Sequence, residues 1–518
     1  MRRIGIDVGG THTDAVLLDG DRVVSWAKAL TSADVLTGIM EALDAVLGRQ
    51  DGVDAAIDAV MLGTTQFTNA VIERRELAEV AAIRIGMPSG DGLPPNIGWP
   101  DDIARCLGTN VYMLHGGSLY DGWPLAELDD AEIDVVIADL VAKKVDAVSI
   151  SSVFSPMNPQ PEIDVGARVR AALPNAHITL SHDIGRLGIL ERENAALLNA
   201  SLLPFAEGVV TSFTNAIRKR GLTCRFFVSQ NDGTLMDAEF ARRYPALTFA
   251  SGPTNSLRGA AKLTGLDDAI VIDIGGTTSD IGVLQDGFPR ESNVVIEVGG
   301  VRTNFRMPDI LALGLGGGSL VADDGSSIGP QSLGHRLVED GLVFGGRTLT
   351  ATDIVVASGK AAVGDAALVA GLDPQLVANA KKSMAEMLDI GVEKMKPSSD
   401  PLPVVLVGGG AILVTETLRS ASELRRPEYA GVANAIGAAI AQIGGETERL
   451  VSYDQMSRQD AIAEVAQEAT QAAVTAGAAP STVRVADIEE TAISYMSGNT
   501  TRLRVKVVGD IAGIAGEA

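Results

Sequence analysis

The 518-residue chain has only two cysteines, Cys106 and Cys224, and no run of basic residues. Two cysteines so far apart in sequence argue against a disulfide framework, a zinc site or a four-cysteine iron–sulfur cluster. Acidic side chains (66) outnumber basic ones (42), which gives a net charge of −24. A chain this acidic repels nucleic acids and anionic lipids, so we expect neither as a partner.

Long apolar runs are also missing. No stretch approaches the roughly 18–20 continuous apolar residues that a membrane-spanning helix requires. The N-terminus enters a strand-like segment without the apolar core of a signal peptide. We therefore expect a soluble, cytoplasmic protein, and its length predicts two or more domains with a substantial core.

One short pattern occurs twice. Residues 4–18 read IGIDVGGTHTDAVLL and residues 270–284 read IVIDIGGTTSDIGVL, a shift of 266 residues. Each copy is typical of two strands joined by a tight turn. The shift aligns Asp7 with Asp273, Gly9 and Gly10 with Gly275 and Gly276, Thr11 with Thr277, and Asp14 with Asp280.

The composition of this turn favours phosphate binding. Paired glycines let backbone N–H groups approach an anion closely, and threonine hydroxyls add donors. An aspartate beside a phosphate makes sense mainly with a divalent cation between them, and Mg²⁺ needs only one or two carboxylates plus phosphate oxygens. A single copy could be an ordinary hairpin. Two copies in register indicate two related domains that hold one polyphosphate from opposite sides.

The two turns resemble the phosphate loops of the actin, sugar kinase and Hsp70 ATPase superfamily. Within it, the chain resembles the hydantoinase/oxoprolinase family, and specifically its hydantoinase A-type subunit. The motifs follow the family order over roughly residues 1–440. Besides the first turn they are GTTQFTNAVIER (63–74), FSPMNP (154–159), LSHDIGRLGILERENAALLNASL (180–202), ASGPTNSLRGAA (250–261), VIDIGGTTSDIGVL (271–284) and LGLGGGSL (313–320).

The resemblance implies an α/β fold with two actin-like (ribonuclease H-like) ATPase domains around a central nucleotide cleft. We expect the first domain over 1–190, the second over 191–446, and a small C-terminal α+β appendage over 447–518. Apolar patterns predict helices over 33–48, 129–144, 431–445 and 455–477, strands over 23–30, 59–63, 145–154 and 223–230, and paired strands within 481–510.

The expected ligands are ATP and Mg²⁺. Asp7 and Asp273 would bind the metal and its waters, while Asp14 and Asp280 would either orient a water or fix the turn. His12 would bind phosphate or substrate, or simply be exposed. The remaining nucleotide-binding candidates are Gly9, Gly10, Thr11, Thr13, Gly275, Gly276, Thr277 and Thr278 in the turns, Gly316 and Gly317 in a glycine run, and Gly408, Gly409 and Gly410 beside adenosine.

Other positions leave two interpretations open. Pro161 and Leu311 stand where relatives often have histidine, which weakens an inference about the substrate. His182 is either structural or reaches a cleft. The polar residues 191–194 either match a cluster typical of the family or form surface salt bridges at a helix start. Residues 86–100 form a lid or a surface connection.

The resemblance further implies that ATP phosphorylates the amide oxygen of a lactam, hydantoin or oxoproline-like ring, which water then opens. A separate B-type subunit would complete the reaction, in an oligomeric assembly. Two alternatives stay open, because phosphate loops do not identify the acceptor. They are a small-molecule kinase of the same superfamily and a regulatory ATPase such as a reactivating factor.

Overall fold

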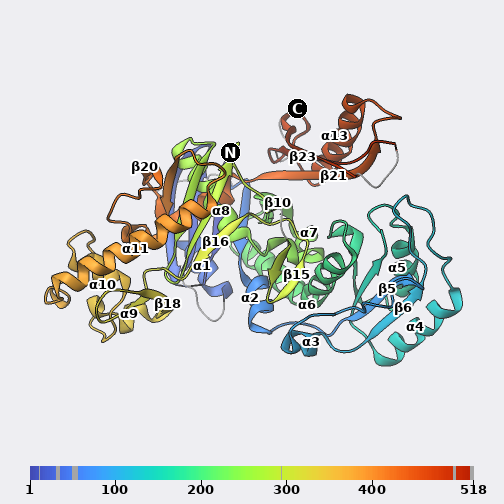
Figure 1. The fold of residues 1–518 in the computed structure, drawn as a ribbon, viewed down its shortest axis with the longest axis horizontal. Coiled ribbons are helices and arrows are strands. Elements are labelled where there is room, and N and C mark those ends of the chain that lie inside the picture. Colours follow the sequence, from blue (N-terminus) through green and yellow to red (C-terminus); the bar gives the residue numbers. More distant parts are fainter. Residues whose placement is uncertain (11, 31–34, 49–56, 293–294, 494–497, 514–518) are drawn as a thin grey trace.

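The computed structural model describes residues 1–10, 12–30, 35–48, 57–292, 295–493 and 498–513 (Figure 1). The first repeat lies in a nine-stranded sheet with the order β22-β23-β21-β10-β9-β4-β1-β2-β3. Its strands are β1 (Arg2–Val8), β2 (His12–Asp19), β3 (Arg22–Leu30), β4 (Ala59–Thr64), β9 (Arg225–Ser229), β10 (Thr234–Asp237), β21 (Gln442–Ser452), β22 (Arg484–Ala492) and β23 (Thr500–Gly509). This first sheet draws on all three predicted segments of the chain.

The second repeat lies in a six-stranded sheet, on the opposite side of Figure 1 from the C-terminal strands. Its strands are β11 (Ala269–Ile274), β12 (Ser279–Gln285), β13 (Phe288–Pro289), β16 (Ile310–Leu313), β19 (Leu402–Val407) and β20 (Ala421–Arg425). The helices α10 (Ala351–Ala357) and α11 (Pro374–Met395) pack their apolar sides against this sheet. Shorter elements on the same side are β17 (Ser319–Val321), β18 (Ile328–Ser332) and α9 (Leu337–Asp340).

The two repeats fold into matching hairpins, as predicted. Asp7 pairs with Asp14 across β1 and β2, and Asp273 pairs with Asp280 across β11 and β12. The turns close alike: the Gly9 N–H donates to the His12 carbonyl at 3.0 Å, and the Gly275 N–H to the Thr278 carbonyl at 2.9 Å. In each sheet the first hairpin strand also has a parallel neighbour, β4 or β19. The sequence repeat is therefore a structural repeat.

A third, fully parallel sheet is inserted between β4 and β9. Its order is β6-β5-β7-β8, and it was not predicted as a separate unit. Its elements are β5 (Ala81–Met87), α3 (Asp101–Leu107), β6 (Val111–His115), α4 (Asp130–Lys143), β7 (Ala147–Ser152), α5 (Gln160–Ala172) and β8 (His177–Leu180). The predicted helix 129–144 is thus confirmed to within one residue at each end, and the predicted strand 145–154 to within two residues at each end.

Two small-residue helices connect the first two sheets. α12 (Ala433–Ile440) packs on β1 and β2, and α8 (Ser251–Thr264) packs on β11 and β19. The helices approach so closely that a Cβ on Gly259 would lie 1.9 Å from the Ala433 carbonyl oxygen. A Cβ on Gly437 would lie 1.8 Å from the Asn255 carbonyl oxygen. Only glycine permits this crossing, and the crossing brings the two hairpin sheets together.

The helix α6 (Ile189–Lys219) follows the inserted sheet. By length and composition alone it is the one described helix that could cross a membrane, but most of its apolar segment (61%) is buried inside the protein. It also carries the buried polar side chains of Arg192, Glu193 and Asn194 near its start. These features are those of a core helix. Three further helices are α1 (Val35–Gly48), α2 (Gln66–Glu73) and α7 (Ala238–Arg243), and a separate strand pair consists of β14 (Ile296–Val298) and β15 (Val301–Thr303).

The C-terminal region contains the predicted helix and paired strands, as α13 (Arg458–Thr475), β22 and β23. Its strands do not form a sheet of their own, because β21 and β23 pair and extend the first sheet. The predicted helix 431–445 is too long. It ends at Ile440, and residues from Gln442 onward already belong to β21, where Gly444 and Gly445 pack tightly against Thr234 and α13.

The helix crossing gives a stability prediction. Gly437→Ala should lower the free energy of unfolding by about 1–3 kcal/mol or more, because the added Cβ overpacks the contact with α8. Gly208→Ala in α6 is the matched control, since its Cβ would meet no atom within 4 Å. That control should be neutral or stabilising by up to about 1 kcal/mol. Calorimetric melting of both variants checks this, and equal melting temperatures would contradict the tight crossing.

Candidate functional site

Asp7 is buried at the end of β1 and is held by two amide side chains. Asn255 Nδ2 donates to Asp7 Oδ1 at 3.1 Å, and Asn434 Nδ2 donates to Oδ2 at 3.0 Å. Within the described residues no lysine or arginine forms an ion pair with it. Burial, with the nearby charges of Asp14 and Asp273, raises the pKa of Asp7 to about 6 despite these hydrogen bonds. The carboxylate is positioned but not neutralised.

Asp273 occupies the equivalent place in the second hairpin. The Ser256 hydroxyl donates to Asp273 Oδ2, so consecutive residues of α8 hold the repeated aspartates of both sheets. Burial raises the pKa of Asp273, and the Asp14 charge raises it further. Because the Asp273 charge also raises the pKa of Asp7, the two hairpins present their carboxylates to a common region.

The second aspartate of each repeat has a different environment. Asp14 forms an ion pair with Lys28 of β3. Asp280 has no such cation within the described chain, and burial together with the Asp273 charge raises its pKa to about 7. The two hairpins are thus alike in backbone and unlike in charge.

Glycines make room for the two repeated carboxylates. A Cβ on Gly63 would lie 2.2 Å from Asp7 Oδ1, and one on Gly408 would lie 2.3 Å from Asp273 Oδ1. By contrast, the Cβ positions of Gly10 and Gly409 meet no atom within 4 Å. The backbone therefore closes tightly on the aspartates and is open at Gly10 and Gly409.

The predicted glycine runs gather around the second turn. The N–H groups of Gly317 and Gly318 donate to the carbonyls of Gly275 and Gly276 at 3.0 and 2.8 Å, and a Cβ on Gly316 would lie 2.5 Å from the Thr277 nitrogen. Gly410 packs against Ile274 and the Gly275 carbonyl. Thr277 and Thr278 are exposed at the turn. Gly316, Gly317 and Gly408–Gly410 were predicted to bind nucleotide, which stays a prediction; the structure brings these two segments, far apart in the chain, to the second turn.

In the first turn, Thr11 lies outside the described residues. Gly9 is half-buried, Gly10 is exposed and Thr13 is buried on β2. His12 is half-buried, and burial followed by the Lys28 charge lowers its pKa, so its imidazole is neutral at physiological pH. Neutral His12 is compatible with hydrogen bonding to a phosphate oxygen, and the exposed alternative does not fit its half-buried position.

The site suits Mg²⁺ held jointly with phosphate oxygens. The described residues contain no group of three or more His, Cys, Asp or Glu side chains arranged to hold a metal. Mg²⁺ binding through one or two carboxylates plus phosphate oxygens needs no such group. The buried Oδ1 of Asn255 has no hydrogen-bond partner among the described atoms, and it lies on the side chain that contacts Asp7. The carboxylates of Asp7 and Asp273, which form no ion pair with a lysine or arginine among the described residues, and the Oδ1 of Asn255 are ligands that suit a small divalent cation.

Sequence reasoning missed several residues of this site. Lys28 and Asn434 carried no motif that marked them, and Asn434 is more than 400 residues from Asp7, its hydrogen-bond partner. Gly63 opens the family motif 63–74, but its contact with Asp7 was not predicted. Asn255 and Ser256 lie in the family motif 250–261, where α8 begins. The motif did not indicate that these two side chains bind the aspartates.

The polar residues 191–194 are not a surface salt-bridge cluster. Glu193 forms a buried ion pair with Arg84 of β5, and the buried Arg192 donates to the Ser152 carbonyl and Ser181 Oγ. The inserted sheet covers this helix start, which sequence alone did not indicate. Of the positions where relatives often have histidine, Pro161 lies in the first turn of α5 and Leu311 packs beside the core of the second sheet. Neither contributes a polar group.

A well-formed cavity lies elsewhere. It has a volume of about 820 Å³ and is lined by segments of the inserted sheet, the β9–β10 turn and the C-terminal strands. None of the predicted turn or glycine-run residues lines it. The region of the repeated turns is marked by its carboxylates and glycine backbone rather than by enclosed volume, since the backbone is open to solvent at Gly10 and Gly409.

Comparison with known proteins agrees with these observations. Residues 3–173 match the profile of the hydantoinase/oxoprolinase N-terminal region, and residues 192–395 match the hydantoinase/oxoprolinase profile. The alpha subunit of caprolactamase from Pseudomonas jessenii is 28% identical over 480 residues, covering 82% of this chain and 67% of the relative. The gamma subunit of acetophenone carboxylase from Aromatoleum aromaticum is 25% identical, covering 77% of this chain and 59% of the relative.

Two solved structures share the fold. The ATP-dependent caprolactamase of Pseudomonas jessenii superimposes with a TM-score of 0.77 at 20% identity, covering 100% of this chain and 89% of that one. Nucleotide-free acetone carboxylase superimposes with a TM-score of 0.68 at 18% identity, covering 99% and 88%. The predicted α/β fold class is confirmed. The chain spans about two thirds or less of the length of the two curated relatives.

The pKa of Asp280 gives a pH prediction. The folded chain holds this proton more tightly than the unfolded chain, where the pKa of Asp is about 3.9, so this group lowers the free energy of unfolding as pH rises from about 4 to 7. Asp280→Asn removes the buried charge. Its melting temperature relative to wild type should therefore increase between pH 5 and pH 8. Asp400→Asn, at an exposed position, should show no such trend, and parallel profiles for all three proteins would contradict the buried charge.

Proposed function

Because the chain belongs to the hydantoinase/oxoprolinase family, we propose that it is the ATP-using subunit of an enzyme that phosphorylates and opens a cyclic amide. The observation that carries this proposal is the pair of duplicated hairpins. Their aspartates, Asp7 and Asp273, are held by neighbouring residues of one helix and share one electrostatic environment. Two such turns, with open glycine backbone, suit the two ends of a Mg²⁺-bound polyphosphate.

The proposed chemistry is phosphoryl transfer to the amide oxygen. The terminal phosphoryl group passes from ATP to the carbonyl oxygen of the ring, and ADP leaves. Water then adds to the carbonyl carbon, and the ring C–N bond breaks with a proton going to nitrogen, which leaves an acyl phosphate. A second water hydrolyses this acyl phosphate to the carboxylate and inorganic phosphate. Positioning and charge neutralisation dominate catalysis of such transfers. In this chain Asp7 and Asp273 bind Mg²⁺ and its waters, which supply that neutralisation when bound.

The turns then divide the nucleotide between them. The N–H groups near Gly10 and Gly276 donate to phosphate oxygens, with the hydroxyls of Thr277 and Thr278 as further donors. Gly409, where the backbone is open, contacts the adenosine. Asp14 is fixed by Lys28 and keeps the first turn in shape. Asp280, whose pKa is raised to about 7, is able to accept a proton from an attacking water near neutral pH.

A partner subunit is part of the proposal. The relatives are named as subunits, one alpha and one gamma, and the described residues contain no second group of catalytic side chains beside the phosphate turns. We propose a B-type subunit that completes ring opening. The assembly is cytoplasmic and oligomeric.

A second candidate function follows from the second relative. Acetophenone carboxylase and acetone carboxylase belong to the matched proteins, so the same phosphate site could serve ATP-dependent carboxylation. The acceptor oxygen would then belong to a ketone enolate or to bicarbonate. The phosphate turns are compatible with either acceptor, as they are with the kinase reaction.

The deciding experiment measures ADP release with Mg²⁺ and ATP against lactams, hydantoins, sugars, and ketones with bicarbonate, with and without the B-type protein. Ring-opened product supports the proposal. A stable phosphorylated product identifies a kinase, and a new carboxylate identifies a carboxylase. Asp7→Ala and Asp273→Ala should each lower turnover by about 100-fold or more. Full turnover in both variants would refute the metal assignment.

Asn255 allows a finer test of the same site. Asn255→Ala removes the donor that orients Asp7, so the Mg²⁺ concentration for half-maximal ADP release should rise about tenfold or more. At saturating Mg²⁺ the turnover should recover better than in Asp7→Ala. Asn379→Ala in α11, where the half-buried amide donates to the Asp324 carbonyl and not to Asp7, is the control, with unchanged Mg²⁺ dependence expected. An unchanged Mg²⁺ dependence in Asn255→Ala as well would show that Asp7 needs no orienting partner.

A further inference from the structure

The cavity of about 820 Å³ and the first turn share one edge of the first sheet. β1, β4 and β9 are parallel neighbours, so their carboxyl ends lie at the same edge. β1 ends at the first turn, and β9 ends just before lining residues 230–232. Because neighbouring strands lie about 4.8 Å apart, β9 is only about 10 Å from β1. This part of the cavity therefore lies near the proposed phosphate site.

The inserted sheet also presents its carboxyl ends to the cavity. β7 and β8 end just before lining residues 155–157 and 182–187. These residues belong to the family motifs 154–159 and 180–202, which the phosphate turns do not explain. In open α/β sheets, ligands bind in crevices outside the carboxyl ends of strands. Two sheets and two family motifs thus mark this cavity as a ligand site.

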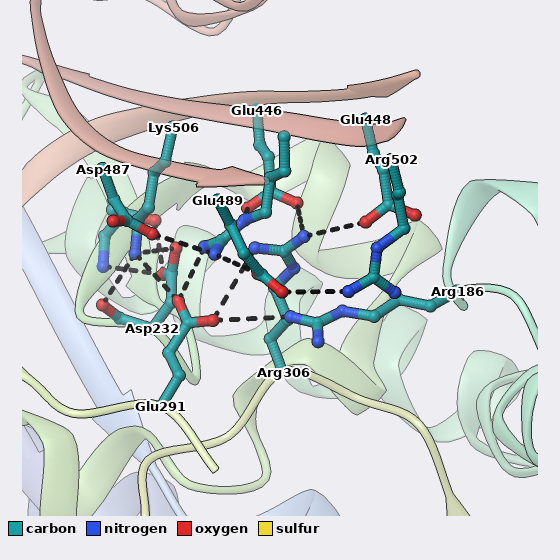
Figure 2. Close-up of polar contacts among 12 residues, drawn as sticks. Arg186, Asp232, Glu291, Arg306, Glu446, Glu448, Asp487, Glu489, Arg502 and Lys506 are labelled. Carbon is teal, nitrogen blue, oxygen red and sulfur yellow. Dashed lines mark hydrogen bonds and ion pairs between the residues drawn. The ribbon is translucent and has the colours of Figure 1, made fainter. Parts of the chain in front are cut away.

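The charged groups of the cavity wall are matched to one another. Figure 2 shows a network of ion pairs between the C-terminal strands and the segments beneath them. Arg306 pairs with Glu446 and Glu448. Arg502 pairs with Glu489, and the lining carboxylates outnumber the lining arginines. Because a buried charge without a partner is costly, this wall suits a ligand that carries no charge.

Three polar atoms of the wall are buried and have no hydrogen-bond partner among the described residues. They are the acceptor Asn304 Oδ1 and the donors Arg186 Nε and Arg306 Nη1. The three side chains lie together, because Asn304 Nδ2 donates to the Arg186 carbonyl at 3.1 Å. The guanidinium groups of Arg186 and Arg306 both reach Glu291, at 3.4 and 3.7 Å. A buried polar atom without a partner costs free energy, so these atoms favour a bound molecule that both donates and accepts.

The amide group of a small ring has this pattern, since the ring holds the amide cis and turns its N–H and carbonyl oxygen to the same side. We propose that this cavity binds an uncharged lactam, whose N–H donates to Asn304 Oδ1 and whose carbonyl oxygen accepts from Arg186 or Arg306. The methylene groups of the ring lie against Met157 and Phe240, which also line the cavity. This inference rests on the proposed function and narrows its substrate to rings without a carboxylate.

The test uses three probes built on one ring. They are δ-valerolactam, its N-methyl derivative, which lacks the N–H donor, and the same lactam with a carboxylate on the carbon beside nitrogen. Titration calorimetry or ligand-observed NMR on the full chain, without nucleotide, measures their affinities. δ-Valerolactam should bind about tenfold more tightly than either derivative, because one loses a buried hydrogen bond and the other adds an unmatched charge.

Asn304→Ala removes the acceptor, so the affinity for δ-valerolactam should fall about tenfold, to that for the N-methyl derivative. Asn379→Ala is the matched control. Both amides are half-buried and donate to a backbone carbonyl, but Asn379 does not line the cavity. This control should bind all three probes like wild type. Phe240→Ala changes a side chain that is 41% exposed, and it should weaken all three probes by a similar factor and keep their order.

Equal affinities of δ-valerolactam and its N-methyl derivative, or an unchanged preference in Asn304→Ala, would overturn this assignment even if ATP-dependent ring opening is observed. Asp7→Ala should bind δ-valerolactam like wild type while it loses turnover. The expected binding pattern without ADP release in any assay would refute the proposed function and not the lactam site.

Discussion

Two like charges from different sheets are held within one electrostatic environment, and the rest of the molecule is arranged around that constraint. Burial raises the pKa of both Asp7 and Asp273; the charges of Asp14 and Asp273 raise that of Asp7 further, and the charge of Asp14 raises that of Asp273 further. What fixes them is neutral: an amide and a hydroxyl from consecutive residues of α8, and a second amide from α12. Neutral donors position a carboxylate without cancelling the charge that a metal ion requires.

This constraint explains the small residues at the centre of the fold. If α8 is to reach both aspartates, the helices of the two sheets must nearly touch, and Gly259 and Gly437 make that contact. Gly63 and Gly408 lie beside the carboxylates for a similar steric reason, because a Cβ at either position would clash with an aspartate oxygen.

Features that depend on short local sequence patterns were predicted, and features that depend on packing between segments far apart in the chain were not. The two hairpins, their aspartates and the helix near Ser251 follow from short patterns that specify turns and caps. The helix expected over 431–445 was extended too far, because Gly444 and Gly445 look like helix-packing residues but lie in a strand beside Thr234. The polar residues at 191–194 look solvated, yet Arg192, Glu193 and Asn194 are buried. No local signal links Asn434 to Asp7 or brings Asn304 and Arg186 to one cavity.

The first sheet has a consequence for how the protein is made. Its hairpin at β1 and β2 leaves the ribosome more than 400 residues before the strands β21, β22 and β23 of the same sheet are synthesised. Until then β10 has an unpaired edge, and such edges invite pairing with other chains. The inserted parallel sheet and the second hairpin sheet can each form from contiguous residues in the meantime. Completion of the first sheet, and with it the wall of the cavity, therefore waits until β23 has been synthesised.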